Sequence, residues 1–306
     1  MTQPVLAITG GTGFVGSCLI RLARAQGYGV RALTRRPQAG KPGLEWISGA
    51  LDQPESLQML ANGCDAVIHV AGVVNAPDRA GFESGNVAGT LAMIDAARHA
   101  GVRRFVHVSS LAAREPGLSL YGWSKARSET LVKASGMDWT IVRPPAVYGP
   151  GDREMLDLFR MARHGFILLP PEGRISVIEV SDLAQLLLAV IPAADTHEKL
   201  FEADDGRPGG WSHSSFGQAI GFAFGKQVRA VHMPAGILGM AARLDRFARG
   251  SAAKLTADRV SYFCHPDWVV DPANKPPAAI WQPGTETLDG LRKTVDAYVE
   301  AGWLRR

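Results

Sequence analysis

A glycine-rich stretch near the start of the chain constrains the fold more than any other feature. Residues 5–8 form a short apolar run typical of a buried strand, and glycines then recur at Gly10, Gly13 and Gly16, where a helix is predicted over residues 14–26. The first glycine allows a sharp turn, the second lets the backbone approach a pyrophosphate, and the third lets the helix pack closely. Because a helix N-terminus presents unpaired N–H groups with a partial positive charge, the unit predicts a dinucleotide site.

Composition limits the class of protein. The 306 residues are 46% hydrophobic and 20% charged, which is typical of a globular chain with room for two domains. The net charge of +4 includes no run of five basic residues, so no nucleic-acid partner is expected. The three cysteines are not spaced as metal or disulfide pairs, and the eight histidines lack metal-binding spacing, so we expect a cytoplasmic protein without a metal.

No membrane span is expected either. The most apolar later stretch, residues 175–194, is interrupted by Glu179, Asp182 and Gln185. Polar side chains at this density are incompatible with a helix that crosses a bilayer. The chain also begins without a signal-like apolar segment.

Strands and helices are predicted to alternate through the first half. The expected strands are residues 5–8, 30–33, 44–47, 66–71, 105–108 and 139–142, and the expected helices are residues 14–26, 54–61, 85–100 and 121–134. Short, continuous apolar strands alternating with helices are typical of a parallel sheet covered on both faces. The predicted fold is therefore α/β, with a doubly wound parallel sheet of the Rossmann type.

The pattern changes after Pro150. Strands are predicted at residues 175–180 and 200–202, and helices at residues 155–163, 181–188 (capped by Ser181), 215–224, 237–249, 256–263 and 288–301. We expect residues 1–150 to form the dinucleotide-binding domain, with a return to it near residues 175–203. Residues 151–174 and 204–306 are expected to form a smaller, mostly helical substrate domain.

Polar residues with acid–base potential follow the fifth predicted strand. Ser109 and Ser110 come directly after it, and Tyr121 and Lys125 lie one turn apart on the next predicted helix. A phenol has a pKa near about 10, and a neighbouring lysine ammonium lowers that pKa. A serine hydroxyl can hold a substrate oxygen against the phenol. The pattern predicts a proton-transfer site for a carbonyl or an alcohol.

The chain at this point resembles the extended branch of the short-chain dehydrogenase/reductases. The matching stretches are TGGTGFVG (9–16), HVAG (69–72), NVAGT (86–90), VSS (108–110), YGWSK (121–125) and RPPAVYGP (143–150), with a fainter match through VIEVSDLA (177–184). The resemblance implies Tyr121 as the acid/base, Lys125 on the nicotinamide ribose and Ser110 on the substrate oxygen. It also implies a homodimer that pairs the predicted helices 85–100 and 121–134.

The resemblance further implies which residues contact the cofactor. These residues are Gly10, Gly13, Phe14, Val15, Gly16, Leu51, Ala71, Asn86, Lys125, Pro144 and Val147. Asn86 has either a structural role or a role on the cofactor side. Ala50 stands where relatives often carry an aspartate against adenine, so the adenine contacts depart from the family pattern.

The turn after the second predicted strand bears on cofactor choice. An NAD enzyme has a carboxylate there for the ribose 2′-hydroxyl, whereas this chain has Arg35 and Arg36. Arginine can bind a 2′-phosphate through charge-assisted contacts. NADP is therefore expected in preference to NAD.

The expected function is NADP-dependent reduction of a ketone or aldehyde, or oxidation of the alcohol. The similarity is strongest on the hydroxysteroid dehydrogenase and dihydroflavonol reductase side of the branch. One alternative is a nucleotide-sugar epimerase or dehydratase, although Ala146 stands where those enzymes often have asparagine. A second is a non-catalytic NADP-binding regulator or assembly subunit. No motif identifies the small-molecule substrate.

Overall fold

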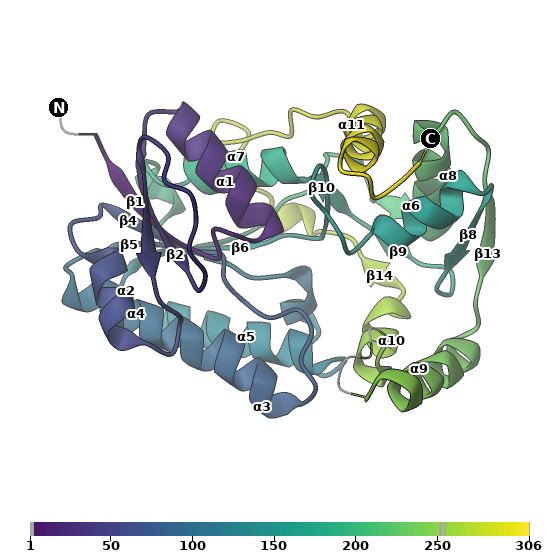
Figure 1. Cartoon of the computed structure of the whole chain (residues 1–306), viewed down its shortest axis with the longest axis horizontal. Coiled ribbons are helices and arrows are strands. Elements are labelled where there is room, and N and C mark those ends of the chain that lie inside the picture. Colours follow the sequence, from purple (N-terminus) through teal and green to yellow (C-terminus); the bar gives the residue numbers. More distant parts are fainter. Residues whose placement is uncertain (1–2, 251–252, 254, 306) are drawn as a thin grey trace. The chain divides into compact units, whose positions relative to one another are not determined.

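The computed structural model describes residues 3–250, 253 and 255–305 and divides the chain into two compact units (Figure 1). The first unit comprises Met1–Pro144, Leu183–Glu202 and Asn274–Gln282, and the second comprises Pro145–Asp182, Ala203–Ala273 and Pro283–Arg306. The first unit thus ends a few residues before the expected boundary at residue 150. Tyr148 explains the difference, because its fully buried side chain belongs to the hydrophobic core of the second unit.

A seven-stranded parallel sheet forms the centre of the first unit, in the order β11-β6-β5-β4-β1-β2-β3. The strands are β1 (Val5–Thr9), β2 (Gly29–Thr34), β3 (Leu44–Ser48), β4 (Ala66–His69), β5 (Arg104–Val108), β6 (Asp138–Arg143) and β11 (Lys199–Glu202). Chain order reverses beside β1, because β2 and β3 lie on one side of it and β4 to β6 on the other. The predicted doubly wound α/β fold is confirmed.

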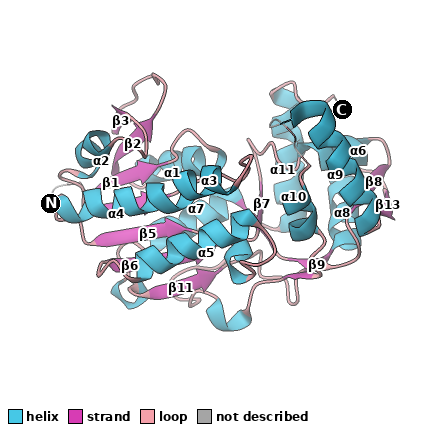
Figure 2. Ribbon diagram, turned by 90° about the horizontal axis from the view of Figure 1, so that it is seen from below, coloured by secondary structure: helices cyan, strands magenta, loops and turns pink. Residues whose placement is uncertain are grey.

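Helices cover both faces of this sheet, α1 and α7 on one face and α2, α4 and α5 on the other (Figure 1, Figure 2). Their bounds are α1 (Phe14–Ala25), α2 (Pro54–Ala61), α3 (Arg79–Phe82), α4 (Gly89–His99), α5 (Leu120–Lys133) and α7 (Val180–Ala189). A π-helical segment, Glu83–Ala88, leads into α4, and a 3-10 helix, Leu111–Arg114, follows β5. The helix expected over residues 85–100 therefore consists of part of a π-helical segment followed by an α-helix.

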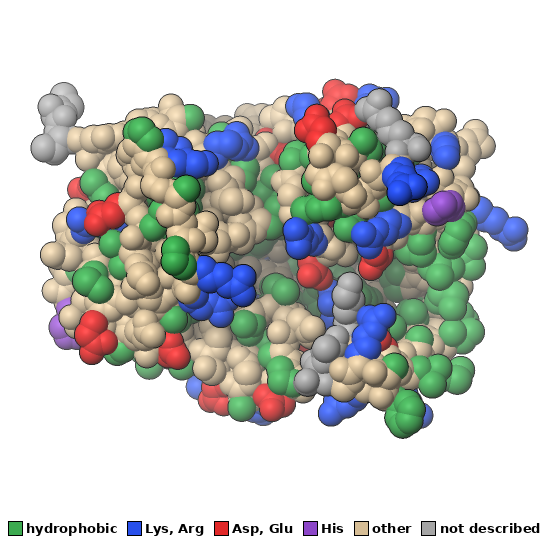
Figure 3. Space-filling model, viewed as in Figure 1, with side chains coloured by type: hydrophobic (Ala, Val, Ile, Leu, Met, Phe, Trp, Pro, Cys, Tyr) green, Lys and Arg blue, Asp and Glu red, His purple; other side chains and the backbone are tan. Residues whose placement is uncertain are grey.

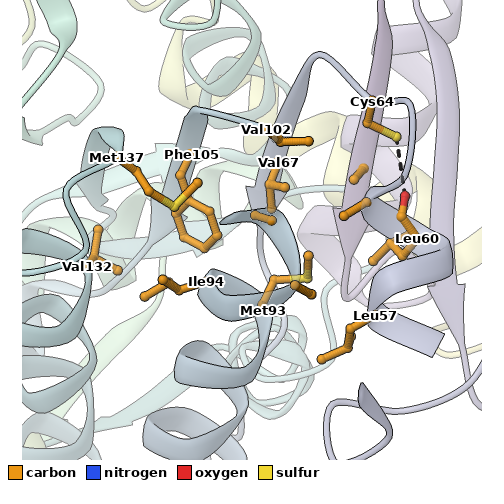
Figure 4. Packing of buried hydrophobic residues seen from close by; sticks show 14 of the residues in the cluster. Leu57, Leu60, Cys64, Val67, Met93, Ile94, Val102, Phe105, Val132 and Met137 are labelled. Carbon is orange, nitrogen blue, oxygen red and sulfur yellow. Dashed lines mark hydrogen bonds between the residues drawn. The ribbon is translucent and has the colours of Figure 1, made fainter. Parts of the chain in front are cut away.

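A hydrophobic core lies between one face of the sheet and the helices that cover it. Leu57 and Leu60 of α2 and Met93 of α4 pack with Val67 and Phe105 of the sheet, and all five are fully buried (Figure 4). Burial of such a side chain contributes about 1.5–3 kcal/mol. This packing fixes the strands whose C-terminal ends carry the candidate site.

The second unit contains helices and three small sheets among its described residues. Its helices are α6 (Leu156–Arg163), α8 (His213–Ala223), α9 (Ala235–Arg249), α10 (Ala257–Phe263) and α11 (Thr287–Glu300). Its sheets pair β7 (Ala146–Tyr148) with β10 (Val177–Glu179), β8 (Phe166–Leu169) with β13 (Arg229–His232), and β9 (Arg174–Ile175) with β12 (Trp211–Ser212) and β14 (Asp267–Trp268). The helices were predicted, whereas most of these short strands were not.

The start of α7 differs from the sequence-based prediction. The expected strand 175–180 is interrupted at Ser176, whose hydroxyl donates to Asp204 at 2.8 Å. Ser181 was expected to cap the helix, but the helix begins at Val180, and a Glu179 carboxylate oxygen accepts from the Ser181 N–H at 2.5 Å. A carboxylate in this position satisfies helix N–H groups and interacts favourably with the helix dipole.

Candidate active site

The glycine turn has the close packing that the sequence predicts. Gly10 has a φ of +72°, and a Cβ there would lie 2.8 Å from the Ala71 amide nitrogen. A Cβ on Gly16 would lie 2.1 Å from the Gly10 carbonyl oxygen, so the helix packs directly on the turn. Around Gly13, in contrast, a Cβ would meet only that carbonyl oxygen, at 3.2 Å. The backbone at Gly13 is therefore open to an approaching group.

The N-terminus of α1 has the character of an anion site. Within the described chain no side chain caps it, and its first turn contains no acidic residue. Phe14 and Val15, the first residues of α1, are half-buried beside exposed Gly13. The unpaired N–H groups and the helix dipole favour a phosphate here.

A buried histidine connects the ends of β1 and β4. The Thr9 hydroxyl lies 2.8 Å from His69 Nδ1 and accepts from the Ala71 N–H at 3.1 Å. His69 Nε2 lies 3.1 Å from the Thr90 hydroxyl, which itself donates to the Asn86 carbonyl oxygen at 2.6 Å. Since the Thr90 proton is used, His69 Nε2 must donate and Nδ1 must accept. This network fixes Ala71 beside the glycine turn.

Asn86 connects the loop after β4 to α5. Its Oδ1 accepts from the Val73 N–H at 2.7 Å, and its Nδ2 donates to the Val73 carbonyl oxygen at 3.0 Å and to Ser124 Oγ at 2.8 Å. Ser124 in turn donates to the Tyr121 carbonyl oxygen at 2.8 Å. Asn86 is buried, and both its Oδ1 and its Nδ2 form hydrogen bonds within the protein. Of its two expected roles, these bonds support the structural one.

Ser110, Tyr121 and Lys125 lie together after β5. Ser119 caps α5 by accepting from the Gly122 N–H at 2.9 Å, so Tyr121 is in the first turn and Lys125 in the second. The Ser110 side chain hydrogen-bonds the Tyr121 phenol. Lys125 Nζ donates to the Val108 carbonyl oxygen at 2.7 Å, at the end of β5. The three residues therefore form one polar group.

The electrostatics of this group differ from expectation in one respect. Lys125 was expected to lower the pKa of Tyr121, but burial raises that pKa and the hydrogen bond from Ser110 only partly opposes the effect. Burial also lowers the pKa of Lys125 to about 8, against the attraction of Glu129. A lysine whose own charge is disfavoured by desolvation stabilises a phenolate less than an exposed ammonium would.

A cluster of buried charges next to this group was not predicted. Arg143 donates to both Glu129 carboxylate oxygens, at 2.8 and 2.7 Å, and to Glu202 at 3.3 Å. The Ser109 hydroxyl donates to Glu129 at 2.6 Å. Glu129 lies one turn beyond Lys125, so the spacing Tyr121, Lys125, Glu129 on one helix face was the available signal.

The other residues expected to contact the cofactor lie in both units of the chain. Arg35 and Arg36 follow β2 directly and are exposed, and within the part of the chain that the structure describes neither guanidinium has a hydrogen bond or ion pair. Leu51 packs against Gly89, where an added Cβ would lie 2.7 Å from the Leu51 side chain. Pro144 is buried in the first unit, and Val147 lies in β7 of the second unit.

Other kinds of site are absent from the described residues. They contain no group of histidine, cysteine or acidic side chains that could hold a metal ion. None of the described helices is long and apolar enough to cross a bilayer.

Comparison with known proteins assigns the family. The model of the NAD(P)H-binding family matches residues 10–191. The chain is 37% identical over 309 residues to ceramide reductase of Caulobacter vibrioides, covering 98% of this chain and 96% of that one. It is 32% identical over 188 residues to a farnesyl-dihydroquinoline-oxide ketoreductase of Stigmatella aurantiaca, covering 52% of this chain and 56% of the relative.

Solved structures share the fold. The UDP-glucose 4-epimerase of Thermotoga maritima superposes with a TM-score of 0.74 at 18% identity, covering 98% of this chain and 99% of that one. The chain belongs to the NAD(P)H-binding extended short-chain dehydrogenase/reductase family. Within this family it is an NAD(P)-dependent oxidoreductase, as its sequence predicted.

Proposed function

We propose that the chain reduces the ketone of a long-chain amide lipid of the ceramide class, with NADPH as the reductant. The observation that carries the chemistry is the hydrogen bond between Ser110 and the Tyr121 phenol, one helical turn from buried Lys125. The substrate class is supported by the similarity to ceramide reductase, which extends through the second unit as well as the first.

The residues at the glycine turn fit a dinucleotide. The open backbone at Gly13 and the uncapped N-terminus of α1 would hold the pyrophosphate, and exposed Arg35 and Arg36 would meet a 2′-phosphate. Lys125 Nζ lies 3.8 Å from the position of a Cβ on Gly72, close to the loop after β4. From there it would bind the nicotinamide ribose hydroxyls. The cofactor, when bound, supplies the hydride.

The side chains have separate roles in proton transfer. The Tyr121 hydroxyl gives its proton to the oxygen that becomes the alcohol, and Ser110 holds that oxygen by a hydrogen bond. Burial, by raising the pKa of Tyr121, keeps the phenol in the protonated form that reduction requires. Hydrogen bonds of Glu129 with Ser109 and Arg143 fix α5 relative to the ends of β5 and β6, and so position the Tyr121 hydroxyl.

The test is an assay of the purified protein with NADPH and three compounds: a long-chain keto-amide lipid in detergent, a short ketone and UDP-glucose. We expect NADPH consumption and an alcohol product, identified by mass, with the lipid ketone. UDP-glucose is also assayed with NAD or NADP, because an epimerase begins by oxidising the sugar. Conversion of UDP-glucose to its epimer with no net change in the cofactor would favour an epimerase and contradict the proposal.

A matched pair of variants tests the proton donor. In Tyr121→Phe the ring still packs but the donor is lost, so turnover should fall by about 10²–10⁴-fold while NADPH affinity stays nearly unchanged. Tyr28→Phe, outside the site just after α1, should behave as wild type. Turnover of Tyr121→Phe within a few-fold of wild type would rule out this role.

A further inference from the structure

Helix α9 of the second unit exposes an apolar stripe. Ile237, Met240, Leu244 and Phe247 are spaced by three or four residues and so share one helix face. They are 43%, 58%, 65% and 92% exposed, respectively. Every residue of α9 is described, and only Ala242 is buried. An exposed apolar face of this kind indicates an interaction surface.

The β8–β13 sheet exposes further apolar residues. Phe166 and Leu168 of β8 and Val231 of β13 are exposed, while Ile167 and Leu169 are buried, as expected for alternation across a sheet. In the register of this pair Leu168 lies opposite Val231. Two residues join β13 to α9, and Figure 3 shows hydrophobic side chains gathered over β8, β13 and α9. We call the exposed apolar residues of these three elements the apolar stripe.

Arginines accompany the stripe. Arg243 and Arg246 of α9 are exposed, as is Arg229 of β13. The single acidic residue of α9, Asp245, pairs with Arg249 at 3.2 Å. The helix therefore carries an excess of positive charge next to its apolar face.

We propose that the apolar stripe docks the protein on the surface of an anionic lipid bilayer. An amphipathic helix with aromatic and aliphatic residues on one face and arginines beside them is the pattern of a helix that lies in a membrane interface. Anionic headgroups complement the arginines, and the acyl boundary takes up Leu244 and Phe247. A second copy is a poorer occupant, because a twofold contact would bring the arginines of both copies to one interface.

Docking would bring the enzyme to a substrate that resides in a bilayer, but the inference from charge and exposure does not depend on the substrate class. The test is co-sedimentation of the full chain with vesicles of phosphatidylcholine alone or mixed with phosphatidylglycerol. We expect binding to the mixed vesicles, and weaker binding as the salt concentration rises. Equal binding to both kinds of vesicle, or to neither, would overturn the proposal.

Two variants separate the apolar and the charged contributions. Leu244→Ser combined with Phe247→Ser should weaken vesicle binding more than about a hundredfold, because two apolar side chains no longer become buried in the bilayer. Arg243→Gln should weaken it by about fivefold. Met59→Ser is the matched control, since Met59 is 55% exposed on α2. Variants that retain wild-type vesicle binding would overturn the proposal.

Two readouts distinguish other outcomes. If light scattering shows that the stripe variants change the oligomeric state without changing vesicle affinity, the stripe binds a second copy and the lipid proposal is wrong. Reduction of a detergent-solubilised substrate should be unaffected by the same variants. The docking proposal and the proposed function can thus fail independently.

Discussion

At the scale of single residues, we propose that Arg35 and Arg36 favour NADP over NAD. Both are exposed directly after β2. No carboxylate stands there to accept a hydrogen bond from a ribose 2′-hydroxyl or to repel a 2′-phosphate. The Thr34 hydroxyl accepts from the Arg36 N–H at 3.2 Å, which holds the backbone of this turn close to the strand end. The guanidinium groups remain available to an anion.

We expect wild type to bind NADP about ten- to a hundredfold more tightly than NAD, because a hydrogen bond to a charged group contributes about 1.5–3 kcal/mol. Arg35→Ala should lose most of this preference and Arg36→Ala less, since Arg35 is nearer the strand end. Dissociation constants of both cofactors, measured by fluorescence titration, check this. Arg127→Ala, exposed on α5, is the control. A preference that survives loss of both arginines would contradict our interpretation of the turn.

In the buried charge cluster, Arg143 pairs with two acidic residues from different elements. Arg143 contacts Glu129 of α5 and Glu202 of β11, and Arg114 lies 3.7 Å from Glu202. Buried ion pairs contribute little net stability, but loss of one partner leaves a buried charge uncompensated. We infer that this cluster fixes the position of α5, and with it Tyr121 and Lys125.

At the scale of elements, β4 and β5 carry two buried histidines that stack with ring centroids 5.5 Å apart. Burial, and after it the charge of Lys125, lowers the pKa of His69 to about 3. The pKa of His107 is lowered well below its usual value by burial, then by Lys125 and His69. His107 Nε2 lies 3.1 Å from the Ser128 hydroxyl. Both rings are therefore neutral in the folded protein.

These histidines make stability depend on pH. Below about pH 6.5 the unfolded chain binds protons that the folded chain does not, so stability is lost as the pH falls toward the folded pKa, by about 1.4 kcal/mol per pH unit for each histidine. In urea unfolding between about pH 6 and 5, His69→Gln should lose less stability than wild type. His99→Gln, exposed at the end of α4, should lose as much as wild type. Parallel pH profiles for wild type and His69→Gln would contradict this account.

The elements also show what a sequence can predict. The central strands β1 and β4 were predictable because each contains a continuous apolar run that is buried on both faces. β7, β8 and β13 were missed because strands of three or four residues carry little periodic signal.

The site was only partly predictable for a similar reason. Helical spacing brings Tyr121 and Lys125 onto one face, and local sequence is enough to find them. Arg143, Glu129 and Glu202 meet only through the order of β5, β6 and β11 in the sheet, so no local pattern connects them. The raised pKa of Tyr121 likewise depends on burial, which spacing does not report.

At the scale of the whole molecule, the chain passes repeatedly between its two units. After the chain has entered the second unit, it returns to the first unit at two segments, Leu183–Glu202 and Asn274–Gln282. β11 completes the parallel sheet beside β6 and carries Glu202 of the buried charge cluster. The sheet that holds the candidate site is therefore complete only when both halves of the sequence are present.

We also expect the molecule to form a homodimer through α4 and α5, as the family resemblance implies. Leu91 of α4 is 44% exposed, and Trp123 of α5 is half-buried beneath the Arg79 guanidinium, 3.9 Å from its ring centroid. A buried contact of these apolar side chains would stabilise a dimer, and a charge at its centre would prevent it.

Light scattering of wild type should therefore give the mass of two chains, and Leu91→Glu should give that of one, because a carboxylate buried in an apolar contact has no partner to offset its desolvation. The control is Leu244→Ser on α9, which should stay dimeric because it leaves α4 and α5 unchanged. NADPH binding by Leu91→Glu would show that the variant is folded. A wild-type protein that has the mass of a single chain, or a Leu91→Glu variant that remains dimeric, would show that α4 and α5 do not form the contact.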